Sequence, residues 1–166
     1  MKLMVCGLAF ALSAGVISAT ELSDREQLIG SWDLVSLENR ATTGEIFQPL
    51  GEHPVGRFTY TADGKMSAQL MRGDRVVFKT TELYSGTAAE KATAYDSYVA
   101  YYGSFEVDPA LHKLTHHVAA SLFPNWTGGE QIRFYELHGD ELILSTKPFQ
   151  ARGKEVTAHV VWRRVH

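Results

Sequence analysis

Apolar and polar residues alternate with a period of two along most of this chain, and turn-forming residues interrupt the alternation at short intervals. Successive side chains of a β-strand point to opposite faces, so the pattern predicts strands that each bury one face. The clearest example is RFTYTADGKMSAQLM (57–71), in which two alternating runs flank Asp63 and Gly64. An Asp-Gly pair in this position predicts a tight β-hairpin.

The same alternation recurs in the segments 30–38, 97–108, 114–118, 130–145 and 155–165. The segment 130–145 predicts a second hairpin, which turns at residues 138–140. Residues 45–56 contain two prolines and two glycines and are expected to form a loop. The segment 87–95 is different, because Thr87 and Glu90 have the spacing of a capping box and alanines follow, which predicts one short helix.

Eight short strands joined by tight turns predict an all-β fold, an antiparallel up-and-down eight-stranded barrel with one short helix. A β-sandwich is the alternative. The barrel is favoured because the strands follow one another as hairpins and because closure removes exposed sheet edges.

The first 19 residues have the layout of a secretory signal peptide. Lys2 precedes an apolar run from Leu3 to Ile17, and Ala19 supplies a small residue at the expected cleavage point. An uncleaved membrane anchor is the alternative, but the run is short of the roughly 20 residues that span a bilayer. We therefore expect a secreted or periplasmic protein whose residues 20–166 form one barrel domain with no integral membrane segment. Its only cysteine, Cys6, would leave with the signal, so no disulfide is expected.

The formal net charge is −3, and the charged residues are scattered, which gives no reason to expect nucleic-acid binding. The sequence contains no Gly-x-Ser-x-Gly motif, phosphate-binding glycine loop or dinucleotide fingerprint, and no cofactor is expected. The oligomeric state does not follow from the sequence.

Several segments resemble one family. LIGSWDLVS places Gly-x-Trp at the start of the first strand, as in lipocalins. PLGEHPVGRFTYTADGKMSAQLM, YVAYYGSFEVD, HHVAASLFPNWTGGEQIRFYEL and GDELILST are similar to the lipocalin-like domain family of bacterial and fungal proteins. The resemblance covers most of residues 28–163. It implies a small barrel with a central pocket, in a family whose members mostly lack an assigned activity.

Near the C-terminus, VWRRV offers an arginine that could cover the ring of Trp32 and close the barrel floor. Arg164 shares the strand face of Trp162 and is the first choice, with Arg163 second.

The adjacent histidines His116 and His117 lie in the stretch LTHHVAASLFPNW. Strand neighbours point to opposite faces, so the two cannot ligate one metal ion from a regular strand. His112 shares the face of His116, but four strand residues separate the two by roughly 13 Å, too far for a common zinc ion. No metal site is expected, since one would need a bulge or a distant His53, His138 or His159. Because Leu114 and Val118 share its face, His116 is expected to point into the barrel, and His117 to point to solvent.

The alternation places further side chains inside the barrel beside His116, and the Pro-Asn-Trp turn is expected at its mouth. The candidate ligand-binding residues are His116, Tyr60, Phe58, Met66, Tyr101, Asn125 and Trp126. The interpretation is an exported protein that binds a small, largely apolar molecule in the barrel cavity. One alternative is a cofactor-independent isomerase, cyclase or dehydratase that uses His116 as acid or base. A filled interior would instead indicate a structural or interaction module.

Overall fold

A computed structural model describes residues 22–166, so the predicted signal peptide lies outside the described residues. One sheet of ten strands contains nearly all of the regular structure. Its strands are β1 (Gly30–Ala41), β2 (Ile46–Phe47), β3 (Pro54–Tyr60), β4 (Lys65–Arg72), β5 (Tyr98–Asp108), β6 (Lys113–Ser121), β7 (Glu130–His138), β8 (Glu141–Thr146), β9 (Phe149–Ala151) and β10 (Lys154–Arg164). The helices are α1 (Asp24–Leu28), α2 (Ala88–Asp96) and the short 3₁₀ turns η1 (Pro109–Leu111) and η2 (Pro124–Trp126).

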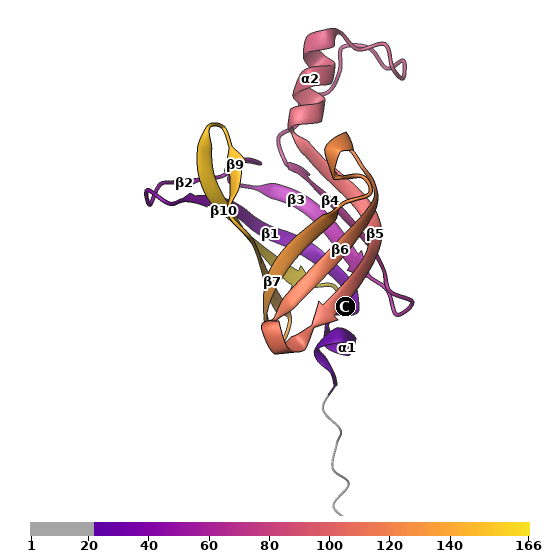
Figure 1. Ribbon diagram of the computed structural model, residues 1–166. Coiled ribbons are helices and arrows are strands. Elements are labelled where there is room, and N and C mark those ends of the chain that lie inside the picture. The colour runs from indigo at the N-terminus through magenta and orange to yellow at the C-terminus, as the bar shows by residue number, and fades with distance from the viewer. Residues whose placement is uncertain (1–21) are drawn as a thin grey trace, which may run out of the picture.

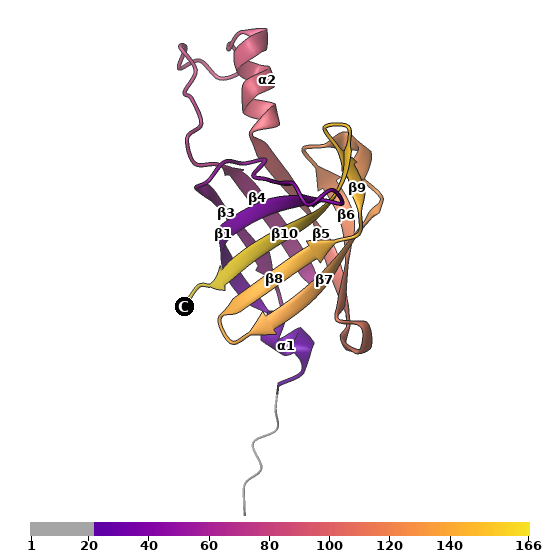
Figure 2. The ribbon, with the colours of Figure 1, turned by 90° about the vertical axis from the view of Figure 1, so that its left-hand side faces the viewer.

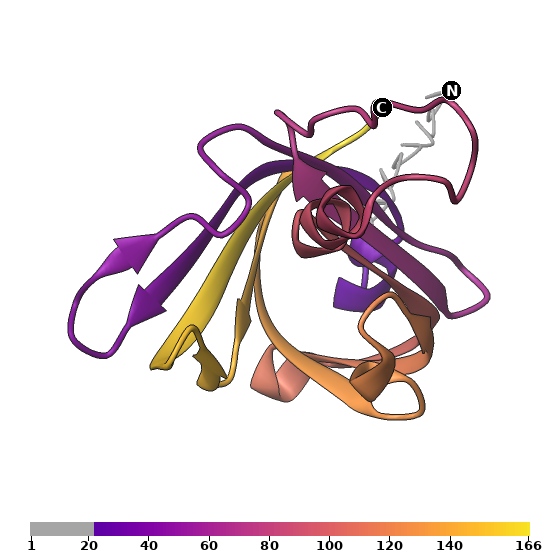
Figure 3. The ribbon, with the colours of Figure 1, turned by 90° about the horizontal axis from the view of Figure 1, so that it is seen from above.

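The sheet closes on itself because β1 pairs with both β3 and β10. Every pairing is antiparallel, and each of the strands β3 to β7 pairs with the next along the chain. Strand β8 then pairs with β10, and the short β2 and β9 extend one rim. Figures 1 and 2 show the wall from two sides, and Figure 3 shows the ring from above. The predicted antiparallel eight-stranded barrel is confirmed.

The helices occupy opposite ends of the barrel (Figure 1). The predicted capping box is present at α2, where Thr87 and Glu90 bond to each other's backbone, but no residue of α2 is buried. The alternation of the chain does not indicate α1, which has only five residues and lies beneath the barrel. Within residues 22–166 the structure contains no helix with the length and apolar character needed to cross a membrane.

The prediction of a continuous loop over residues 45–56 is wrong at both ends. Ile46 and Phe47 pair with β1, and Pro54 begins β3, opposite Arg72 of β4. Proline lacks a backbone N–H and is tolerated at the first residue of a strand. The loop is therefore confined to residues 48–53, between β2 and β3.

A bulge between β5 and β6 sets the register around the histidines. The pairing shifts between Tyr102 and Gly103, after which Ser104 faces His117 and Phe105 faces His116. A Cβ on Gly103 would lie 1.9 Å from the carbonyl oxygen of His117, so only glycine permits this approach of the two backbones. Below the bulge the alternation is regular, which keeps His116 on the inner face.

Candidate functional site

The helix α1 and the start of β1 form the floor of the barrel. Leu28 and Trp32 are fully buried there, and the indole Nε1 of Trp32 donates to the carbonyl oxygen of Leu28 at 3.0 Å. The hydroxyl of Tyr135 donates to the Asp24 carboxylate at the start of α1. These contacts tie α1 to β1 and β7.

Arg164, rather than Arg163, lies over the ring of Trp32, with its Cζ 4.1 Å from the ring centroid. Its guanidinium donates to the carbonyl oxygens of Ile29, at 3.1 Å, and Gln27, and it lies 3.5 Å from the Asp140 carboxylate. Gly30 has a φ of +137°, and a Cβ there would lie 3.2 Å from this guanidinium. The glycine of the Gly-x-Trp motif thus leaves room for the arginine that closes the floor.

Above this floor the barrel encloses a cavity of about 590 Å³. That volume lies within the range of about 300–1,000 Å³ usual for small-molecule sites. Most of its wall is apolar, and includes Phe58, Met66, Leu70, Val99, Leu144 and Trp162. The short turn η2 and the segment that follows β8 line the mouth, through Trp126 and through Lys147, Pro148 and Phe149.

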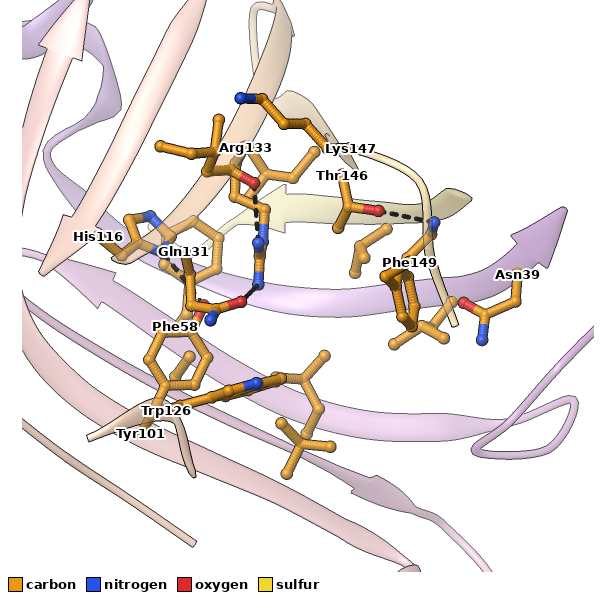
Figure 4. A pocket seen from close by; sticks show the side chains of 18 of the residues that line it. Asn39, Phe58, Tyr101, His116, Trp126, Gln131, Arg133, Thr146, Lys147 and Phe149 are labelled. Atoms are coloured by element: carbon orange, nitrogen blue, oxygen red, sulfur yellow. Dashed lines mark hydrogen bonds between the residues drawn. The ribbon is translucent and has the colours of Figure 1, made fainter. Parts of the chain in front are cut away.

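Some polar side chains of the wall, those of His116, Gln131 and Arg133, lie toward one side, whereas Asn39 lies at the other (Figure 4). His116 is 2 % exposed and contacts a tyrosine at each ring nitrogen. Its Nε2 lies 2.5 Å from the hydroxyl of Tyr60, and its Nδ1 lies 3.0 Å from the hydroxyl of Tyr101. His116, Tyr60 and Tyr101 therefore form a continuous chain of hydrogen bonds from β3 through β6 to β5.

The positions of the protons in this chain of hydrogen bonds follow from its donors and acceptors. The Tyr60 hydroxyl is buried and bonds, among the described residues, only to His116. Tyr60 must therefore donate to Nε2, because the opposite tautomer would leave its O–H buried without an acceptor, at a cost of about 1–3 kcal/mol. The Nδ1–H of His116 then donates to Tyr101. Tyr101 lines the cavity, and its own O–H is left free to donate into it.

The buried environment keeps the side chains of His116 and Tyr60 uncharged. Burial lowers the pKa of His116 well below its ordinary value, and the positive charges of Arg133 and His117 act in the same direction. Burial likewise raises the pKa of Tyr60 well above its ordinary value. Near neutral pH, His116 is therefore a neutral imidazole and Tyr60 a neutral phenol.

Arg133 of β7 also lines the cavity. Its guanidinium donates to the carbonyl oxygen of Ile132 at 2.8 Å and to the side-chain oxygen of Gln131 at 3.4 Å. Figure 4 shows Arg133 and Gln131 on the same side of the cavity as His116. The cavity thus combines an apolar wall with a compact group of hydrogen-bond donors.

Five of the seven candidate residues lie in the cavity wall, namely Phe58, Met66, Tyr101, His116 and Trp126. Tyr60 does not line the cavity; it lies behind His116 and holds that ring in place. Asn125 is exposed and lies outside the wall. A 3₁₀ helix has about three residues per turn, so Trp126 points inward while its neighbour in η2 does not.

His117 lies on the outer face of the barrel, where its ring nitrogens are each 3.3 Å from a carboxylate, of Glu106 and of Glu130. The strand thus separates the two adjacent histidines, one inside and one outside. Among residues 22–166 no group of three or more histidine, cysteine, aspartate or glutamate side chains is arranged to hold a metal ion.

The sequence reasoning missed the polar cavity residues Arg133, Gln131, Thr146 and Asn39. Both faces of β7 mix apolar and polar residues, so alternation alone does not show which face is buried. Tyr135, which is 3 % exposed, shares the inner face with Arg133. A tyrosine buried two residues away is the signal that would have placed this arginine inside.

Comparisons with known proteins agree with this geometry. A family model described as "lipocalin-like domain" matches residues 29–165. The chain is also similar to the 4'-hydroxy-3'-methoxypropiophenone carrier protein of Aspergillus oryzae. The two are 36% identical over 107 residues, which cover 60% of this chain and 96% of the fungal protein.

Proposed function

This chain belongs to the lipocalin-like domain family, and on that premise we propose that it binds a small, largely apolar molecule in its barrel cavity. The observation that carries the proposal is the cavity of about 590 Å³, which has a mostly apolar wall and a few polar groups. Removal of apolar surface from water supplies affinity, at roughly 25 cal/mol per Å², and the polar groups orient the ligand.

The related fungal protein supports a carrier role, since its name assigns it 4'-hydroxy-3'-methoxypropiophenone as cargo. A small aromatic ketone suits a wall of this kind, because its ring contacts apolar side chains and its carbonyl oxygen accepts a hydrogen bond. Tyr101 offers such a donor, because it lines the cavity and the donor assignment above leaves its O–H free.

The enzymatic alternative, with His116 as acid or base, has less support. Both ring nitrogens of His116 are hydrogen-bonded to tyrosines, so neither faces the cavity free. A proton could reach a bound molecule only through Tyr101. The arrangement therefore supports a role of His116 in a rigid wall that positions a ligand, more than a role as a base that reacts with it.

A titration tests the proposed function. Residues 20–166 are titrated with N-phenyl-1-naphthylamine, a neutral apolar dye that becomes fluorescent in apolar surroundings, and then with 4'-hydroxy-3'-methoxypropiophenone as competitor. We expect saturable binding of one dye molecule per chain and its displacement by the ketone. Absence of dye binding by a folded protein would refute the proposal, and turnover of the ketone would favour the enzymatic alternative.

We also propose that the protein is exported, because residues 1–19 have the composition of a signal peptide. Expression of the full chain, followed by mass measurement of the exported product, should give a chain that begins at Thr20. Retention of the full-length chain in the cytoplasm would contradict export.

A further inference from the structure

The guanidinium of Arg133 has no carboxylate partner within residues 22–166. None of the ion pairs among those residues includes Arg133. A positive charge beside an apolar wall is costly unless an anion compensates it, because the surroundings screen it poorly. The cavity therefore holds a charge that the described residues do not balance.

The two acceptors that hold Arg133 in place are both neutral. They are the Ile132 backbone carbonyl and the Gln131 side-chain amide. An arginine carries five N–H donors, so this pair of bonds leaves three of them without a partner in the described chain. Gln131 and Ile132 fix the orientation of the guanidinium without using up its capacity to bind.

The other charged groups of the cavity lining do not neutralise it. Glu130 is exposed, and its carboxylate contacts His117 on the outer face. Lys147 is exposed at the mouth and adds a second positive charge. The field of Arg133 reaches the polar chain, since its charge contributes to the lowered pKa of His116.

The polar groups near Arg133 also favour a ligand group that accepts hydrogen bonds. His116 uses both ring nitrogens within the tyrosine pair, and Tyr101 presents its O–H to the cavity. The wall thus offers donors from Arg133 and Tyr101, and no carboxylate of residues 22–166 pairs with Arg133 there. A ligand group that accepts several hydrogen bonds and carries negative charge complements this surface.

We propose that the ligand carries an anionic oxygen group, such as a carboxylate, and that Arg133 binds this group while the apolar wall holds the rest of the molecule. The proposal rests on the proposed function and narrows its ligand class from apolar molecules to apolar acids. A planar guanidinium binds a carboxylate through two parallel hydrogen bonds, which lysine cannot do. Charge-assisted bonds of this kind are also stronger than bonds between neutral groups.

The test compares two ligands of equal size, 2-naphthoate and 2-naphthamide, as competitors of N-phenyl-1-naphthylamine at pH 7. We expect wild-type protein to bind naphthoate about tenfold more tightly than naphthamide, which corresponds to about 1.4 kcal/mol. In Arg133→Met the preference should fall below about twofold while the neutral dye still binds. Arg133→Lys should retain part of the preference, because it keeps the charge without the planar fork.

A control variant separates Arg133 from cations outside the cavity. Arg163→Met removes an exposed arginine from β10 and should keep the preference for naphthoate. Equal affinity for the two ligands in wild-type protein, or an unchanged preference in Arg133→Met, would overturn this inference and leave the proposed function intact. Failure of the neutral dye to bind folded wild-type protein would overturn both.

Discussion

Two arginines of this barrel, one in the floor and one in the cavity wall, differ in how their charge is compensated. Arg164 lies over Trp32, donates to two backbone carbonyls and approaches Asp140. Arg133 has two neutral acceptors and, within residues 22–166, no carboxylate partner. The floor therefore completes its own interactions, whereas the cavity leaves donors for another molecule. Stability is expected to depend on the first arginine and binding on the second.

The largest expected effect concerns the floor itself. Trp32→Ala removes a fully buried indole together with its bond to Leu28, and should lower the free energy of unfolding by about 3–5 kcal/mol. Urea denaturation measures this. Val35→Ala on the same strand is the matched control, because Val35 is 42% exposed, and should change stability by less than about 0.5 kcal/mol. A loss below about 1 kcal/mol for Trp32→Ala would show that the floor is not what holds the barrel closed.

The two arginines can be compared directly by the same substitution. Arg164→Met loses a cation–π contact and charge-assisted hydrogen bonds, and should lower the free energy of unfolding by about 2 kcal/mol. Arg133→Met removes an uncompensated charge and should leave stability unchanged or raise it slightly. Denaturation of both variants in parallel checks this. The comparison fails if Arg133→Met is the more destabilised of the two.

The buried imidazole predicts a dependence of stability on pH. His116 has a lowered pKa when folded, so its unfolded form takes up a proton first as the pH falls below about 6.5. Its contribution to stability is complete above that pH and is lost below it, by at most about 1.4 kcal/mol per pH unit. Burial also lowers the pKa of His159, which adds in the same direction.

Unfolding measured at several pH values from 7 to 5 should therefore show a smaller slope for His116→Asn than for wild-type protein. His159→Asn is the control, and its slope should fall less because His159 is only partly buried. Identical slopes for wild-type protein and His116→Asn would mean that the folded state accepts the proton as readily as the unfolded chain.

The smallest expected effect tests the orientation of the hydrogen-bond chain. Tyr101→Phe removes the O–H that is directed into the cavity, and should weaken binding of the aromatic ketone by about 3- to 10-fold. Tyr102→Phe, a change on the neighbouring residue whose side chain is 57% exposed, is the matched control. Equal affinities in a calorimetric titration would indicate that Tyr101 donates to His116 rather than to the ligand.

The fold is largely predictable from local pattern, whereas the site is only partly so. Alternation and turn residues are properties of neighbouring positions, and they predict the barrel and the inward face of His116. The Trp32–Arg164 pairing comes from the resemblance to lipocalins, with alternation favouring Arg164 over Arg163. Neighbouring positions do not show how deep within the barrel a side chain lies. Tyr60 and Tyr101 both face inward, yet Tyr60 lies behind His116 and Tyr101 lines the cavity. Arg133 was missed for a similar reason, since a charged residue in a mixed strand is ordinarily read as exposed.

The central claim is that this barrel binds its ligand in the cavity, and a cavity-filling variant tests it most directly. Ala158 of β10 lines the cavity and is 8% exposed, so Ala158→Phe places a ring inside it, while Ala89→Phe adds the same ring to an exposed position on α2. Fluorescence titration with N-phenyl-1-naphthylamine should show that binding is lost in Ala158→Phe and kept in Ala89→Phe, with thermal melting used to verify that both variants are folded. Unchanged binding by a folded Ala158→Phe would place the ligand elsewhere and contradict the account.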